Sequence, residues 1–468
     1  MERLSSLDSA FLHLEDTGSP LHIGSVAILE GPVPSQAAIR HALVRKLPLV
    51  PRYRQRVRRV PLSLGRPVWV DVTSFDVDYH LRRTALPAPG GPAELRELVE
   101  RVMSQPLDRD LPLWESWVVE GLEEGRWALL TKVHHSMVDG IAGTDLLGRV
   151  LDSTPDPDPV PDDDWSPRAA PSGLVLLAGA VEERLLDPVT DLFALAGTLR
   201  HPRSLAERAL ETGRGLLGFA GGLVPVRSSS LQGHVGHQRR YRWAQVPIPE
   251  VLDVRAGLGG TVNDVVLAAV SLAFRDLLLG RGESRGPRAV RTLVPVSVRS
   301  ADQRGRDDNR VSAILADLPV DVGDPVDCLH EVSRRMIGLK ATHEAEAGET
   351  VTALADLLPP PGVALTLTAA ARFPQRVLTT VTTNVPGPRG TLYLCGRRML
   401  ATYPYVPIAD RLRVGIAVTS YDGSLLFGMT GDRETTADLD VLADGLVEAF
   451  ALLHKAALET AAQEGPPR

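Results

Sequence analysis

A proline- and aspartate-rich run, Thr154–Trp165, is the feature that most constrains the fold, because it divides the chain into two halves. Proline does not pair regularly in a helix or a sheet and like charges repel, so this run predicts a linker. A chain of 468 residues is long enough for two or three domains. We therefore expect an N-terminal domain over residues 1–153, a linker and helical connector over 154–235, and a C-terminal domain over 236–468.

Both halves alternate between strand-like and helix-like patterns. Helical spacing is clearest where Leu95, Leu98 and Val102 share one face, and Asp422-Gly423 between two apolar stretches predicts a hairpin. This mixture predicts an α+β fold with mixed sheets. We expect strands near residues 25–30, 115–120, 127–135, 238–247, 289–299, 310–320 and 379–383, and helices near 35–46, 95–103, 140–151, 262–279, 324–343 and 437–458.

The connector is mostly helical in pattern between residues 174 and 223, and an apolar run at 215–226 overlaps the end of this stretch. This run is shorter than the ~20 residues that a membrane-spanning helix requires. It is compatible with a helix buried in the protein and with a helix that lies on a membrane surface.

Composition excludes several classes of protein. The net charge of −7 provides no general attraction for nucleic acid. Two cysteines, Cys328 and Cys395, are too few for a disulfide framework or a structural zinc cluster. The first residues include acids where a signal peptide would be apolar. We therefore expect a soluble cytoplasmic protein.

The most informative segment is His134-His135-Ser-Met-Val-Asp139-Gly140, at the end of an expected strand. Adjacent residues on a strand point to opposite faces, so the two histidines do not easily share a metal ion, and only one of them faces a given cleft. A histidine that is neutral near pH 7 can act as a general base. A buried histidine pair followed by a turn at Asp139-Gly140 explains the same residues, and both interpretations stay open at this point.

Polar residues also mark the start of the helix expected at 262–279. Thr261 and Asp264 have the spacing of a capping box, which explains both without any function. Asn263 is not explained in this way, and its amide could donate a hydrogen bond to a substrate oxyanion. Asn384 ends a strand ahead of Val-Pro-Gly-Pro388, where turn formation is a sufficient explanation.

Two other signals carry less weight. Gly282–Gly286 matches the G-x-S-x-G string of a nucleophile elbow, but a helix is expected before it and a strand after it, the reverse of what that motif needs. Gly257–Gly260 lacks the full dinucleotide-binding pattern and is expected to form a turn between two helices.

Taken together, the segments resemble the bacterial wax ester synthase/diacylglycerol acyltransferase family, within the CoA-dependent acyltransferases that share an HHxxxDG motif. HHxxxDG also occurs in peptide-synthetase condensation domains and chloramphenicol-type acetyltransferases, but the other segments favour this family. Thr383 stands where serine is commoner in the family. The matching segments are Leu4–Asp8 with Phe11, Pro112-Leu113-Trp114-Glu115, His134–Gly140, Asn263-Asp264-Val-Val, Val294–Arg299 and Asn384–Pro388.

The resemblance implies two chloramphenicol-acetyltransferase-like domains packed side by side, with an active-site tunnel between them. In such an enzyme His135, beside His134, takes the proton of the acceptor hydroxyl, and the oxygen attacks the thioester of acyl-CoA directly. Acyl-CoA is then a substrate, and no metal, cofactor or acyl-enzyme is required. The implied supporting roles fall to Asp139 with its partner Arg299, to Asn263 as oxyanion donor, to Gly140, Asp264 and Asn384 as structural support, and to Pro112, Leu113 and Trp114 as channel walls.

The implied activity is transfer of an acyl group from acyl-CoA to a long-chain fatty alcohol, to diacylglycerol or to both, which makes wax esters and triacylglycerol. An enzyme with another acceptor, such as a polyketide alcohol or an amine, and a non-catalytic lipid-surface protein are the alternatives. Oily acceptors make attachment to the inner membrane face or to lipid droplets an open possibility beside the cytoplasm. Neither the oligomeric state nor the preferred acyl-chain length follows from the sequence.

Overall fold

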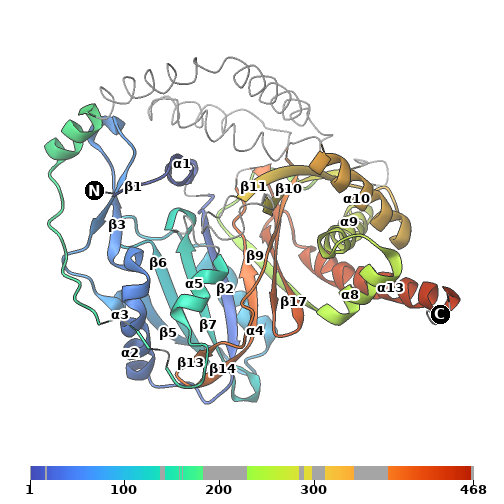
Figure 1. Ribbon diagram of the computed structural model, residues 1–468, viewed down its shortest axis with the longest axis horizontal. Coiled ribbons are helices and arrows are strands. Elements are labelled where there is room, and N and C mark those ends of the chain that lie inside the picture. Colours follow the sequence, from blue (N-terminus) through green and yellow to red (C-terminus); the bar gives the residue numbers. More distant parts are fainter. Residues whose placement is uncertain are drawn as a thin grey trace, which may run out of the picture.

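Two six-stranded mixed sheets with helices around them form most of the described fold, beside one three-stranded and one two-stranded sheet, which confirms the expected α+β class (Figure 1). This computed structural model describes residues 2–15, 18–137, 143–157, 159–160, 162–182, 229–283, 289–297, 311–341, 378–409 and 411–464. Figure 1 shows the first sheet on the N-terminal side of the molecule and the second sheet on the C-terminal side.

The first sheet has the strand order β13-β14-β2-β7-β6-β5, in which only β5 and β6 are parallel neighbours. Helix α4 (Pro92–Met103) covers one face with the apolar stripe predicted for it, and α2 (Gln36–Lys46) packs on the other. The strands are β2 (His22–Leu29), β5 (Leu81–Ala85), β6 (Trp114–Glu120), β7 (Trp127–His134), β13 (Tyr393–Leu394) and β14 (Arg397–Tyr405).

The second sheet has the order β11-β10-β12-β16-β17-β9, with β12 parallel to both of its neighbours. Its strands are β9 (Arg239–Pro247), β10 (Val290–Ser297), β11 (Val311–Leu318), β12 (Thr380–Val385), β16 (Val414–Tyr421) and β17 (Ser424–Asp432). The face away from the first sheet is covered by α8 (Ile248–Leu258), α9 (Val262–Gly280), α10 (Pro325–Ala341) and α13 (Leu439–Glu464) (Figure 1).

Strand β14 comes from the C-terminal half of the chain but belongs to the first sheet. It pairs antiparallel with β2, from Met399 opposite Leu29 to Tyr405 opposite Gly24. Residues 393–405 were expected in the C-terminal domain because of their place in the sequence. In the structure they extend the N-terminal sheet. Strand pairing between segments so distant in sequence is not visible in local patterns. The domain boundaries themselves stay predictions.

Several local predictions are confirmed. Asp422 and Gly423 both have positive φ, 44° and 78°, in the tight turn between β16 and β17. The described residues of Thr154–Trp165 form neither helix nor strand, and Asp163 pairs there with Arg54 of the N-terminal half. Of the predicted connector the structure describes the first part, in which residues 173–182 are helical, and its last residues, 229–235. The apolar run 215–226 lies outside the described residues.

Two elements differ from expectation. The strand expected to include His135 ends at His134, and His135 begins a short 3₁₀ turn, η5 (His135–Met137). The turn forms because the Ser136 N–H folds back onto His134 Nδ1, at 3.1 Å, in place of continuing the strand. Helix α1 (Ser6–Leu14) was not predicted; it is capped by the Ser5 side chain, which accepts from the Asp8 N–H.

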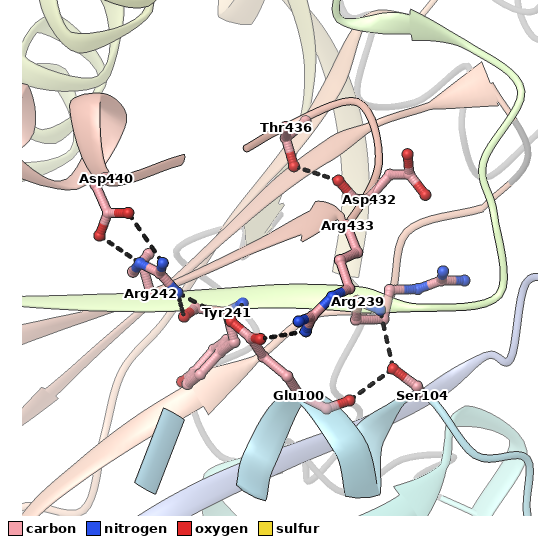
Figure 2. A network of polar contacts seen from close by, with 9 residues as sticks. All are labelled: Glu100, Ser104, Arg239, Tyr241, Arg242, Asp432, Arg433, Thr436 and Asp440. Atoms are coloured by element: carbon pink, nitrogen blue, oxygen red, sulfur yellow. Dashed lines mark hydrogen bonds and ion pairs between the residues drawn. The ribbon is translucent and has the colours of Figure 1, made fainter. Parts of the chain in front are cut away.

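A buried carboxylate on α4, Glu100, connects the two halves of the molecule (Figure 2). Its oxygens accept hydrogen bonds from the Tyr241 backbone N–H at 3.0 Å, from Arg242 at 2.9 Å and from Arg433 at 3.0 Å. One turn later, Ser104 Oγ accepts from the Arg239 backbone N–H at 2.9 Å. The last turn of α4 is thus bonded to the start of β9 and to the loop after β17.

Loss of the Glu100 carboxylate leaves two guanidinium groups and an amide without their buried acceptor. We predict that Glu100→Ala lowers the free energy of unfolding by about 3–5 kcal/mol, as is typical when one partner of a buried ion pair is removed. Urea denaturation followed by circular dichroism measures the effect. Glu97→Ala, on the exposed side of the same helix, is the control, and an equal effect of the two substitutions would contradict this account.

Candidate active site

The paired histidines lie where β7, an inner strand of the first sheet, ends and η5 begins. Each histidine is held by a neighbouring segment through its backbone. The His134 N–H donates to the Leu113 carbonyl at 2.9 Å, and the His135 N–H donates to the Leu21 carbonyl at 3.0 Å. Backbone hydrogen bonds to these two neighbouring segments therefore fix the positions of both histidines.

His135 is half-buried, and its imidazole packs against an aromatic ring of α1. The centroids of the Phe11 and His135 rings are 4.0 Å apart. Burial and the charge of the adjacent His134 lower the pKa of His135 from 6.5 to about 4. The side chain is therefore neutral near pH 7, which is the protonation state that a general base requires.

His134 is fully buried, and its ring is bonded at one end and faces a carboxylate at the other. Nδ1 lies 2.7 Å from Ser136 Oγ and 3.1 Å from the Ser136 backbone nitrogen. Nε2 lies 3.5 Å from Glu15 Oε2. Sequence patterns did not single out Glu15. Its spacing of four residues from Phe11 was the available signal, because residues at i and i+4 share one side of a helix.

Strand β7 is also anchored to α4 through a buried lysine. Lys132 Nζ donates to the carbonyl oxygens of Val102 and Gln105 at the C-terminal end of that helix. Burial lowers the pKa of Lys132 to about 8, and the opposing charge of Glu115 limits the fall. Next to it, His22 Nε2 lies 2.7 Å from the Met103 carbonyl oxygen.

The segment Pro112-Leu113-Trp114 packs in the N-terminal core. Trp114 is fully buried, with its ring stacked between those of Tyr53 and His80 and its Nε1–H bonded to the Tyr53 carbonyl. Leu113 is equally buried and contributes its carbonyl to His134. This packing accounts for both residues, and their role as channel walls stays a prediction.

Asn263 and Asn384, far apart in sequence, come together between α9 and β12. Asn384 Nδ2 donates to Asn263 Oδ1 at 3.3 Å. With its oxygen engaged, Asn263 keeps Nδ2 as a donor for another group. The NVPGP segment needs its glycine, because a Cβ on Gly387 would lie 1.6 Å from the Ser420 carbonyl oxygen.

Asp264 has the structural role predicted for it. The Asp264 N–H donates to Thr261 Oγ1 at 3.2 Å, and the Thr261 N–H donates to Asp264 Oδ2 at 2.9 Å, which completes the capping box. The same carboxylate oxygen lies 3.4 Å from Ser333 Oγ on α10. The cap thus fixes the start of α9, where Asn263 lies.

The remaining candidates, Asp139, Gly140 and Arg299, lie outside the described residues, as does most of Gly282–Gly286. Within the described ranges no hydrogen bond joins the histidines to the pair Asn263 and Asn384, so their meeting in one site stays a prediction. The same ranges contain no cluster of three or more His, Cys, Asp and Glu side chains suited to a metal ion. No described helix has the length and apolar character to cross a membrane.

Two mixed sheets, with paired histidines where an inner strand ends, define the two-domain class of CoA-dependent acyltransferases. The wax ester synthase/diacylglycerol acyltransferase from Marinobacter aquaeolei VT8 is similar in structure, with a TM-score of 0.69 and 26% identity over 98% of this chain and 100% of that chain. The first condensation domain of the calcium-dependent antibiotic synthetase shares the fold, with a TM-score of 0.60 and 19% identity over 98% of this chain and 97% of that chain.

The family follows from the sequence comparisons. Residues 4–266 match the model of the wax ester synthase/diacylglycerol acyltransferase catalytic domain, and residues 308–454 match that of the WS/DGAT C-terminal domain. A Mycobacterium tuberculosis protein named "probable diacyglycerol O-acyltransferase tgs1" is 39% identical over 97% of this chain and 96% of its own length. The chain belongs to the wax ester synthase/diacylglycerol acyltransferase family and is an acyltransferase, which confirms the resemblance drawn from its motifs.

The surroundings of His135 predict an abnormal titration. In NMR spectra of histidine-labelled protein, we expect the His135 imidazole to titrate near pH 4 and not near 6.5. Phe11→Ala exposes the ring and should move the midpoint upward, because less burial penalises the charged form less. Leu14→Ala, at the exposed end of the same helix, should leave it unchanged. A wild-type midpoint near 6.5 would contradict the account.

Proposed function

We propose that this acyltransferase moves a long-chain acyl group from acyl-CoA to the free hydroxyl of diacylglycerol, and also to long-chain fatty alcohols, with His135 as the general base. The observation that carries the proposal is a neutral, half-buried His135 directly after β7, inside the HHxxxDG segment of this family. The printed name of the mycobacterial relative supports diacylglycerol as the main acceptor.

The proposed acyl transfer needs one group, His135, that accepts a proton and later returns it. His135 accepts the proton of the acceptor hydroxyl while the oxygen attacks the carbonyl carbon of the thioester. The tetrahedral intermediate then collapses, the C–S bond breaks, and the proton held by His135 passes to the departing sulfur of CoA. General-base assistance of this kind contributes about 10²–10⁴ in rate. No step forms a bond between the acyl group and the protein.

Asn263 is our candidate to stabilise the negative charge of the tetrahedral intermediate. Asn384 occupies the Asn263 oxygen, which leaves Asn263 Nδ2 as a donor for another group. A single donor directed at an oxyanion is worth roughly 10²–10³ in turnover. The helix start that carries Asn263 adds the favourable end of its dipole.

The supporting assignments complete the proposal. We assign Asp139 a structural role with Arg299 as its candidate partner, and Gly140 a supporting role; these three assignments rest on the family resemblance. Pro112 and Leu113 form part of the apolar wall that excludes water and so favours transfer over hydrolysis. Acyl-CoA is a substrate, and neither a metal ion nor a cofactor takes part. The enzyme works in the cytoplasm, at the inner membrane face or on lipid droplets, where its acceptors gather.

The proposed reaction is tested by release of CoA thiol from palmitoyl-CoA, with dipalmitoylglycerol or hexadecanol as acceptor. We expect acceptor-dependent release with both, faster with dipalmitoylglycerol, and a loss of about 10²–10⁴ in His135→Ala because its general base is gone. His41→Ala, an exposed histidine on α2, is the matched control and should keep full activity.

Either of two results would refute the proposal. Full activity in His135→Ala would remove the base from the mechanism. Absence of release from the wild-type enzyme with both acceptors would exclude this acceptor class and favour a different alcohol or an amine.

A further inference from the structure

The end of helix α1 touches both histidines of the active-site segment. Phe11, in its last turn, packs on the ring of His135, and Glu15, the C-cap residue, faces the ring of His134. Helix α1 lies against η5 along this contact. The N-terminal helix is therefore part of the surroundings of the catalytic base.

The two oxygens of the Glu15 carboxylate contact different partners. Oε2 lies 3.5 Å from His134 Nε2 and 2.5 Å from Arg109 Nη2. Oε1 accepts the Leu21 N–H at 3.1 Å, and the Leu21 carbonyl in turn accepts the His135 N–H. One carboxylate is thus linked to His134 through its side chain and to His135 through the backbone of Leu21.

The hydrogen bonds of His134 define which nitrogen carries its proton. A backbone N–H can only donate, so the Ser136 N–H makes His134 Nδ1 an acceptor. In a neutral ring the proton is then on Nε2, the atom that faces Glu15. Acceptors beside the second nitrogen of a histidine are known to fix its tautomer and ring orientation.

Glu15 stays ionised throughout the working pH range. Burial alone would raise the pKa of its carboxyl, but the contacts with His134 and Arg109 outweigh burial and lower the pKa to about 2. Its side chain is 7% exposed, which is uncommon for a carboxylate. A buried, permanently charged acceptor with three partners is a costly feature that packing alone does not explain.

We propose that Glu15, held by Arg109, is a positioning residue for acyl transfer: it fixes the tautomer of His134 and, through Leu21, the backbone of His135. The proposal rests on the proposed function, because positioning is defined relative to His135 as the base. Glu15 acts through the two histidines and takes no proton from the substrate.

The kcat and KM values of two Glu15 variants distinguish a positioning role from a general effect on folding. Glu15→Ala should lower kcat by about 10–100-fold, the effect of slightly misplacing a catalytic group, with the KM values for palmitoyl-CoA and acceptor nearly unchanged. Glu15→Gln keeps the side-chain length and one acceptor oxygen, whereas an amide group replaces the second oxygen and the charge is lost. Its kcat should fall by about threefold, less than in Glu15→Ala. Leu14→Ala, next to Glu15 and exposed, is the control and should keep wild-type values.

A spectroscopic measurement tests the contact without any turnover. In long-range ¹H–¹⁵N spectra of histidine-labelled enzyme, with His134 assigned by His134→Gln, the wild type should show the Nε2–H tautomer alone. Glu15→Ala should show both tautomers, whereas Leu14→Ala should match the wild type. If Glu15→Ala does not fold, Arg109→Gln takes its place, because it removes the guanidinium that holds the carboxylate, and it should also lower kcat.

The outcomes distinguish this inference from the proposed function. An unchanged kcat in Glu15→Ala, in an enzyme that loses activity in His135→Ala, overturns the role of Glu15 and leaves the function intact. An inactive wild type refutes the function, and the spectra then decide the contact: a tautomer mixture in Glu15→Ala supports it, and an unchanged spectrum overturns it.

Discussion

The last turn of α4 makes the buried polar contacts that connect the two halves of the molecule. Its Glu100 carboxylate receives Tyr241, Arg242 and Arg433 from the C-terminal half (Figure 2). Its final carbonyl groups receive Lys132 from the strand that carries the histidines. Buried charges are tolerated only where each finds partners of opposite sign or polarity. One helix end therefore connects the strand of the paired histidines to the second sheet.

Close packing of the two sheets supports this alignment. Tyr241 on β9 donates its hydroxyl to the Pro404 carbonyl on β14, at 2.8 Å. Gly428 on β17 faces the same carbonyl, and a Cβ at that position would lie only 1.6 Å from the oxygen. Glycine permits this approach because it has no side chain. The two sheets are therefore in direct contact at this point, where a side chain at position 428 would not fit.

Local signals in the sequence were sufficient for features governed by local physics. The capping box of Thr261 and Asp264, the Asp422-Gly423 turn and the apolar stripe of α4 depend on neighbours a few residues away. Features that depend on distant neighbours were missed. Strand β14 pairs with β2, and more than half of the chain separates these two strands in sequence. Glu15 lies beside the histidines only because α1 packs against η5 in the folded protein. The histidine motif marked the site, but its nearest carboxylate lay more than a hundred residues earlier.

In the proposed reaction a neutral His135 lets the alcohol attack acyl-CoA directly. Rapid-quench measurement of CoA release, with enzyme at high concentration and palmitoyl-CoA in excess, tests it before and after acceptor is added. The account predicts no release in proportion to enzyme without acceptor, no acyl adduct in the mass spectrum of the protein, and release that begins on addition of dipalmitoylglycerol. A burst of one CoA per enzyme without acceptor, with an acylated protein, would contradict it.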